Sequence, residues 1–173
     1  MLGGMARLPL ALLLCLAWFR PAHALVLVDQ SASDIMRQAD LVVLGTVTAQ
    51  RSVLVRGAVM TQTLVRVEET LKGRPARQVV VSQLGGRING VEVDVPGDAR
   101  LRVGERVVLA TYGHPDGLRY LVGMALGVFH VTPGGARQQV DATLVRANGE
   151  VVSTPPRALE LSTLRVLAKG GRP

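Results

Sequence analysis

The sequence predicts a mainly β domain, a barrel or sandwich with small helices at its ends. Short apolar or alternating runs recur at close spacing, and clusters of Gly, Pro, Asn and Asp separate them. One run, Thr61 to Leu71, would be about 35 Å long if extended at ~3.3 Å per residue. So long a strand in a small domain predicts a coiled sheet or a barrel.

The first 24 residues are expected to be a cleaved signal peptide. Met1 to Arg7 is a short positive segment, Leu8 to Phe19 is an apolar run, and Ala22-x-Ala24 is a small-x-small cleavage site. The apolar run is shorter than the roughly 20 residues that span a bilayer. We therefore expect residues 25–173 to form one exported domain with no stable membrane insertion.

Cys15, the single cysteine, offers an alternative to this leader. It would be the lipidated first residue of a mature lipoprotein, anchored at the membrane surface. Leu14 before it and its position inside the apolar run argue against this alternative. If the signal peptide is cleaved after Ala24, the mature chain has no cysteine and depends on its hydrophobic core for stability.

Charge and aromatic content limit the partners of the mature chain. Without Arg7 and Arg20, 18 basic residues face 13 acidic ones, a net charge of +5. Such a charge permits weak binding to anionic surfaces. However, only Tyr112, Tyr120 and Phe129 remain to stack against bases, and the sequence therefore argues against a nucleic-acid partner.

The elements follow one another without a repeat or a long linker. Residues 31–39 predict a short helix, because Ser31 and Asp34 fit a capping box. Gly45, inside the apolar run 41–50, predicts a bulge, a bend or a close backbone approach. Asn148-Gly149 predicts a hairpin. Further strands are predicted at 61–71, 77–84, 105–112, 118–123 and 126–131, and a last helix within 157–169.

Five segments resemble a group of exported bacterial proteins, most of them uncharacterised. They are "ADLVVLGTV", "TLVRVEETLKG", "VVVSQLGG", "GERVVLATY" and "YLVGMALGVFHV", and the likeness covers residues 31–131. The order of the first two strands and "LKG" also resembles the netrin-like module of tissue inhibitors of metalloproteinases. That resemblance implies an OB-like five-stranded barrel, here with a short N-terminal helix and a C-terminal hairpin plus helix.

The resemblance does not extend to the mechanism of those inhibitors. They resemble one another in covering a protease zinc with a disulfide-tied amino-terminal cysteine. The mature chain expected here begins at residue 25 and has no cysteine. Inhibition of an extracellular protease therefore stays an alternative function, without that mechanism.

Glu68 and Glu69 pose the question of a catalytic carboxylate pair. Neighbours on a regular strand point to opposite faces, whereas a hydrolase needs two carboxylates facing each other across roughly 5–9.5 Å. On a regular strand Val67, Glu69 and Leu71 would lie on one face, so Glu69 interrupts an otherwise apolar series. A bulge near the strand end would explain this interruption. We interpret the pair as a solvated strand end.

No other pattern predicts catalysis, a metal or a cofactor. His114 beside Asp116, with His130 or Asp94, is the one alternative for a metal-dependent hydrolase, but the spacing matches no known ligand pattern. "YGHPDG" is typical of a turn. The sequence also has no nucleophile elbow and no phosphate-binding loop.

The sequence thus favours a non-catalytic binding or structural module of the bacterial envelope or the extracellular space. The segment between Leu84 and Arg100 is the predicted contact for a protein partner, since it is longer than the usual connection of about 2–5 residues. It either adds an exposed edge strand, with Ile88, Glu92 and Asp94 in contact, or caps the barrel and buries its valines.

Overall fold

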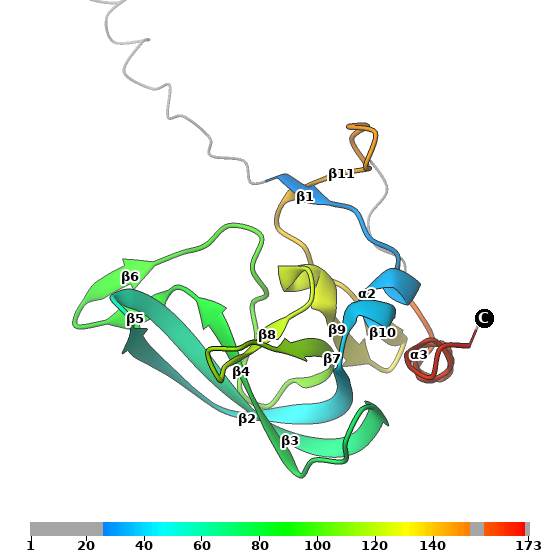
Figure 1. Ribbon diagram of the computed structural model, residues 1–173, viewed down its shortest axis with the longest axis horizontal. Coiled ribbons are helices and arrows are strands. Elements are labelled where there is room, and N and C mark those ends of the chain that lie inside the picture. The colour runs from blue at the N-terminus through cyan, green and yellow to red at the C-terminus, as the bar shows by residue number, and fades with distance from the viewer. Residues whose placement is uncertain (1–25, 153–157, 172–173) are drawn as a thin grey trace, which may run out of the picture.

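The computed structural model describes residues 26–152 and 158–171, so the expected signal peptide and Cys15 lie outside the described residues. Seven strands form one curled sheet in the order β10–β9–β7–β2–β3–β4, with β8 paired to β7 (Figure 1). These are β2 (Leu41–Val55), β3 (Ala58–Lys72), β4 (Gln78–Leu84), β7 (Arg106–Gly113), β8 (Arg119–Leu121), β9 (Val128–Thr132) and β10 (Gly135–Arg137). The mainly β fold is confirmed.

Two helices, a 3-10 turn and two small sheets complete the described chain. The helices are α2 (Ala32–Gln38) and α3 (Leu161–Ala168), and the turn is η1 (Met124–Gly127). Strand β1 (Val26–Val28) pairs in parallel with β11 (Thr143–Val145), and β5 (Gly86–Ile88) pairs antiparallel with β6 (Val91–Val93). Among residues 26–152 and 158–171, no helix has the length and apolar character needed to cross a bilayer.

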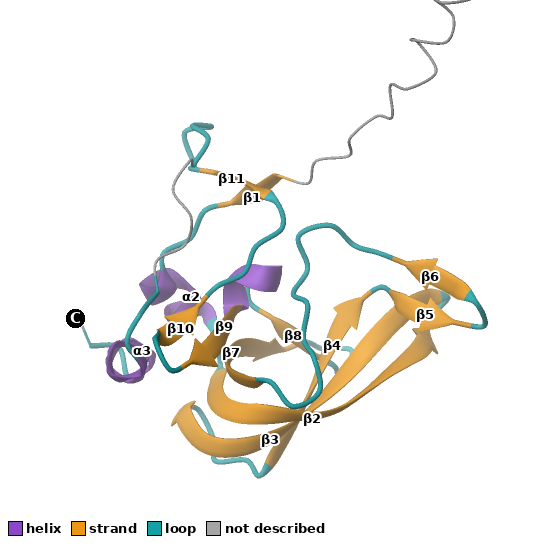
Figure 2. Ribbon diagram, turned by 180° about the vertical axis from the view of Figure 1, so that it is seen from behind, coloured by secondary structure: helices purple, strands orange, loops and turns teal. Residues whose placement is uncertain are grey.

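The core lies on both faces of β2 and β7, which explains their nearly continuous apolar sequence. Val42 and Leu44 pack with helices α2 and α3 and with Phe129. Their neighbours Leu41 and Val43 pack inside the curl of the sheet. Figure 2 shows the two helices and the curled sheet from behind. A strand that is buried on both faces does not alternate between apolar and polar residues.

The long hairpin of β2 and β3 curls because its ladder is interrupted. The register shifts between Leu44 and Gly45, so that Glu68 is left without a partner, as the expected bulge near that strand end requires. A Cβ added at Gly45 would clash with the carbonyl oxygen of Arg66 and lie 2.9 Å from Cγ1 of Val65. The bulge and the close backbone approach predicted at Gly45 are both present.

The sheet is not closed, and the five-stranded barrel expected from the sequence is therefore not formed. Strand β4 ends the sheet on one side, and β8 lies beside it without a ladder. Strand β8 has three residues, and Gly123 and Met124 then adopt left-handed φ values of 63° and 57°. The chain thus turns away into η1 before it can pair with β4.

The opposite edge of the sheet is covered by the chain itself. The amide of Ala136 in β10 donates to the carbonyl of Leu159, and the amide of Leu159 donates back, both over 2.8 Å. The predicted hairpin at Asn148-Gly149 is present but short, with a bridge between Val145 and Val151. The parallel pairing of β11 with β1 was not predicted.

Candidate functional site

The open side of the sheet forms a seam, which we define as the space between β4 and the β7–β8 hairpin. The amide of Val67 in β3 donates to the carbonyl of Arg77 over 2.9 Å. Beyond the other end of β4, the amide of Gly85 donates to the carbonyl of Val59 over 2.8 Å. In an antiparallel ladder, alternate residues of a strand bond to the neighbouring strand, and the residues between them point their N–H and C=O groups away from it. The groups that face the seam are therefore those of Gln78, Val80, Ser82 and Leu84.

The edge of β4 carries no charge and no proline, two features that usually protect an exposed strand, and β8 lies beside it without a ladder. Its sequence, "QVVVSQL", contains no charge, no proline and no glycine. Val80 is 45% exposed and Leu84 is 54% exposed. Natural proteins protect such edges with charges, proline, bulges or a covering segment. Within the described residues, no ladder covers this edge.

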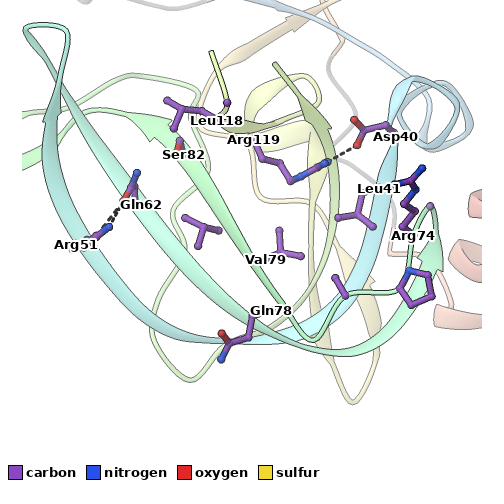
Figure 3. Close-up of a pocket in the computed structure, with 15 residues that line it drawn as sticks. Asp40, Leu41, Arg51, Gln62, Arg74, Gln78, Val79, Ser82, Leu118 and Arg119 are labelled. Atoms are coloured by element: carbon purple, nitrogen blue, oxygen red, sulfur yellow. Dashed lines mark hydrogen bonds and ion pairs between the residues drawn. The ribbon is translucent and has the colours of Figure 1, made fainter. Parts of the chain in front are cut away.

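A large basic groove, with a volume of about 900 Å³, opens beside the first half of β4. Arg51, Arg74 and Arg119 line it, and Asp40 is the single acid among its described lining residues (Figure 3). Arg51 donates through Nε and Nη2 to Oε1 of Gln62, over 3.0 and 2.8 Å. This guanidinium is thus held by a neutral amide, and its charge stays available to a ligand.

Arg119 is fixed at the wall of this groove. It donates to the Asp40 carboxylate and, over 3.2 Å, to Oγ1 of Thr111. Asp40 also accepts the amide of Gly113 over 2.7 Å. Burial raises the pKa of Asp40, but the hydrogen bonds from Gly113 and Arg119 outweigh it and hold the pKa below 3.8. Figure 3 shows the Arg119 side chain directed at Asp40.

A second groove, the tyrosine groove, has a volume of about 380 Å³ and lies beside the end of β4. Ser82 lines both grooves, so they meet at this residue. The rings of Tyr112 and Tyr120 are 5.9 Å apart and tilted by 34°. Other side chains that line the groove are Met60, Leu84, Asp98, His114 and Met124.

His114 and Asp116, the two residues of the predicted turn, do come together. His114 Nδ1 lies 3.1 Å from Asp116 Oδ2, which also accepts the Tyr120 hydroxyl over 2.8 Å. Burial raises the pKa of Asp116, but hydrogen bonds from the Leu118 amide, Tyr120 and His114 lower it below its usual value. Burial and then Asp116 raise the pKa of Tyr120.

His130 does not join them. It is buried in β9 opposite Val107, and its Nδ1 lies 3.5 Å from Oε2 of Glu105. Burial lowers the pKa of His130, although Glu105 acts in the opposite direction. In the described part of the chain, no three His, Cys, Asp or Glu side chains gather where they would hold a metal ion. The structure thus does not assemble the site that a hydrolase with His114, Asp116 and His130 would need.

Glu68 and Glu69 bind different arginines. Glu68 accepts Oγ1 of Thr46 and Nε of Arg106, each over 2.7 Å. Glu69 accepts Nε and Nη2 of Arg165 from helix α3 over 2.7–3.1 Å. The Thr46 hydroxyl and Arg106 lower the pKa of Glu68, and Arg165 lowers that of Glu69. The Glu68 carboxylate thus joins the end of β3 to β7, and the Glu69 carboxylate joins it to α3.

The predicted partner contact forms a hairpin that begins where the seam ends. Ile88 is half-buried, and the Arg87 amide beside it donates to Oγ of Ser52 over 3.0 Å. Glu92 and Asp94 are exposed. Val91 and Val93 are 59% and 40% exposed, so these two valines are not buried as the capping alternative expects, whereas Val95 is half-buried. The hairpin lies at the opposite end of the molecule from α3 (Figure 1).

No motif in the sequence marks the seam, although the composition of β4 carries one signal. Seven uncharged, β-prone residues without proline are typical of a strand that pairs on both sides. Aromatic residues are few in residues 25–173, and the fold places two of them, Tyr112 and Tyr120, in one groove. Comparison of the sequence with protein-family models and with curated proteins gives no match.

Proposed function

We propose that the chain is a non-catalytic binding module of the bacterial envelope or the extracellular space, and that it binds an extended segment of a partner protein at the seam. The observation that carries this proposal is the row of backbone groups at Val80, Ser82 and Leu84, which face the seam without a ladder. An extended segment that adds to such an edge gains main-chain hydrogen bonds, and adjacent pockets select its side chains.

The asymmetry between the two edges of the sheet supports this function. The β10 edge is covered by residues around Leu159 of the same chain. The β4 edge is uncharged and flanked by two grooves, and its outward-facing hydrogen-bonding groups form no ladder with β8, which lies beside it. An edge of this composition invites association with another chain.

We propose that the fold is related to OB-like barrels and is an opened form of one. Strands β2, β3, β4, β7 and β8 would form the five-stranded barrel if β4 and β8 were paired. A partner strand at the seam would supply the hydrogen bonds that β8 does not form with β4.

The test is a selection of displayed random decapeptides on the purified chain, followed by affinity measurements on variants. Val80→Pro removes an amide that faces the seam rather than β3, so it is tolerated in the fold and blocks strand addition. Selected peptides are expected to bind this variant at least about tenfold more weakly than the parent. Val103→Lys, at a 62% exposed valine outside both grooves, is the control and leaves binding unchanged.

Val80→Lys is the second variant, because it places a charge on the edge without touching the backbone. Peptides that bind both Val80 variants as tightly as the parent would contradict the proposal. So would a selection that returns no binder. Binders lost on combined substitution of Glu92 and Asp94, but kept by both Val80 variants, would place the contact on the β5–β6 hairpin instead.

A further inference from the structure

The tyrosine groove concentrates residue types that are rare elsewhere in the chain. Residues 25–173 contain three aromatic residues and three methionines, and two of each line this groove. The pairs are Tyr112 with Tyr120 and Met60 with Met124. Tyrosine and methionine are enriched where protein surfaces bind partners, because they offer large apolar contacts with few polar atoms.

A carboxylate lies in the lining of this apolar groove. Oδ1 of Asp98 accepts Nε2 of Gln83 over 3.1 Å and the amide of Ala99 over 2.7 Å. Within the described residues both hydrogen bonds go to Oδ1, which leaves Oδ2 for a ligand. Burial raises the pKa of Asp98 above its usual value, against the two hydrogen bonds that lower it. A carboxylate in this position gains most from a cation that enters the groove.

The backbone at the groove is held in an unusual conformation. Met124 has a φ of 57°, in the left-handed region that residues other than glycine seldom adopt. Unlike Arg56 and Asn89, the two other such residues, Met124 does not precede a glycine in a hairpin turn. Strain of this kind collects at binding sites, where surrounding structure maintains it.

We infer that the tyrosine groove is the anchor site for an arginine side chain of the segment bound at the seam, an inference that rests on the proposed function. The planar guanidinium stacks on a tyrosine ring while one of its N–H groups donates to Oδ2 of Asp98. The methionines contact the aliphatic part of the arginine side chain. Asp98 is the carboxylate in the lining of this groove, while the nearby Asp116 is held by His114 and Tyr120.

The opposite charges of the two grooves also set the direction of the bound segment. The basic groove, with Arg51, Arg74 and Arg119, lies beside the start of β4, and the tyrosine groove lies beside its end. A segment with an acidic side chain at one end and an arginine at the other matches both grooves in one orientation only. Complementary charges of this kind fix register.

Two blocked tripeptides test the anchor directly, valine-arginine-valine and the same peptide with citrulline, the neutral isostere of arginine. Binding is followed by chemical shifts of the ¹⁵N-labelled chain. The arginine peptide is expected to bind at least about tenfold more tightly, with the largest changes at the amides of Tyr112, Tyr120 and Leu84. Asp98→Asn should abolish this preference, whereas Asp94→Asn, at an exposed carboxylate outside both grooves, should keep it.

Equal affinity of the two peptides, or a preference that survives Asp98→Asn, would overturn the inference. A lysine peptide that binds as tightly as the arginine peptide would also overturn it, since a guanidinium would then not be required. Tyr112→Leu is a second variant that leaves the carboxylate in place and is expected to weaken binding of the arginine peptide. Selected decapeptides that lack arginine but depend on Val80 would refute the anchor and leave the proposed function standing.

Discussion

Gly45 is a position in β2 where a Cβ would collide with the backbone of β3. Its Cα faces the carbonyl of Arg66, and the register of the two strands shifts beside it. This bulge is one of the register shifts in the β2–β3 ladder, and such bulges bend a strand. A single missing side chain therefore contributes to the shape of the seam.

Gly45→Ala is expected to destabilise the fold by about 1–3 kcal/mol, because the added methyl group meets backbone that can move only with its strand. The free energy of unfolding, measured in urea, checks this. Gly134→Ala is the matched control, since the nearest atom to its Cβ is 4.0 Å away, and it should stay within about 0.5 kcal/mol of the parent. Equal stability of the two variants would show that β2 and β3 do not need this close approach.

Asp98 should make stability fall as pH rises. Its pKa is raised above 3.8 in the folded state by burial, so the unfolded chain ionises first. As pH increases from about 4 through the folded-state pKa, the unfolded state is favoured by this group. Asp98→Asn keeps an oxygen to accept the bonds from Gln83 and Ala99 and removes that penalty.

The stability of Asp98→Asn relative to the parent is therefore expected to rise as pH increases above about 4 and to level off above the folded-state pKa of Asp98. Urea unfolding of both proteins at each pH measures the difference. A relative stability that falls with increasing pH would mean that the folded state favours the ionised carboxylate.

Single residues show where prediction from sequence stops. The divergence of Glu68 and Glu69 followed from strand geometry, and each binds its own arginine. Arg165, however, is 96 residues from Glu69, and nothing local in either segment specifies this pairing. Partners that the fold brings together over such separations are decided by packing of the whole chain.

At the scale of elements, helix α2 illustrates local encoding. Ser31 Oγ accepts the amide of Asp34 over 3.1 Å, and its hydroxyl donates back to the Asp34 carboxylate over 2.7 Å. The helix then packs Ile35 and Met36 into the core. The N-cap bond of the predicted capping box is thus present, while the Asp34 carboxylate accepts the hydroxyl of Ser31.

Ser31→Ala is expected to cost about 1 kcal/mol of stability, because it leaves the Asp34 amide without its capping acceptor. Ser33→Ala is the control, since Ser33 is exposed inside the same helix and caps nothing in the described chain. Thermal or urea unfolding distinguishes them. An equal decrease in the free energy of unfolding of both variants would show that the Ser31 cap does not stabilise the N-terminus of α2.

Elements with a strong local signal were predicted, and those that depend on distant partners were not. The main strands and both helices follow from apolar patterns and turn residues. Strand β1 and strand β11 are three residues each and pair across more than 110 residues, so neither has a periodicity to detect. The segment between Leu84 and Arg100 was predicted either to add an exposed edge strand or to cap the barrel. It contains Asn89-Gly90 with φ values of 50° and 82°, which fold residues 86–93 into a hairpin.

For the molecule as a whole, closure of the barrel was the feature that the sequence did not determine. Closing it requires a ladder between β4 and β8, and the left-handed residues Gly123 and Met124 end β8 too early for that. Alternation and turn signals describe each strand but do not say which strands remain unpaired. The seam, and with it the candidate site, is a consequence of this single missing ladder.

Amide hydrogen exchange along β4 is the measurement that most directly tests the central claim, which is addition of a partner strand at this edge. In the free chain, the amides of Val80 and Leu84 face the seam and should exchange fast, whereas those of Val79, Val81 and Gln83 are bonded to β3 and should exchange slowly. Saturation with a selected decapeptide should slow exchange at Val80 and Leu84 by at least about tenfold and leave the other three unchanged. Fast exchange at Val80 and Leu84 in the saturated complex would contradict strand addition at the seam.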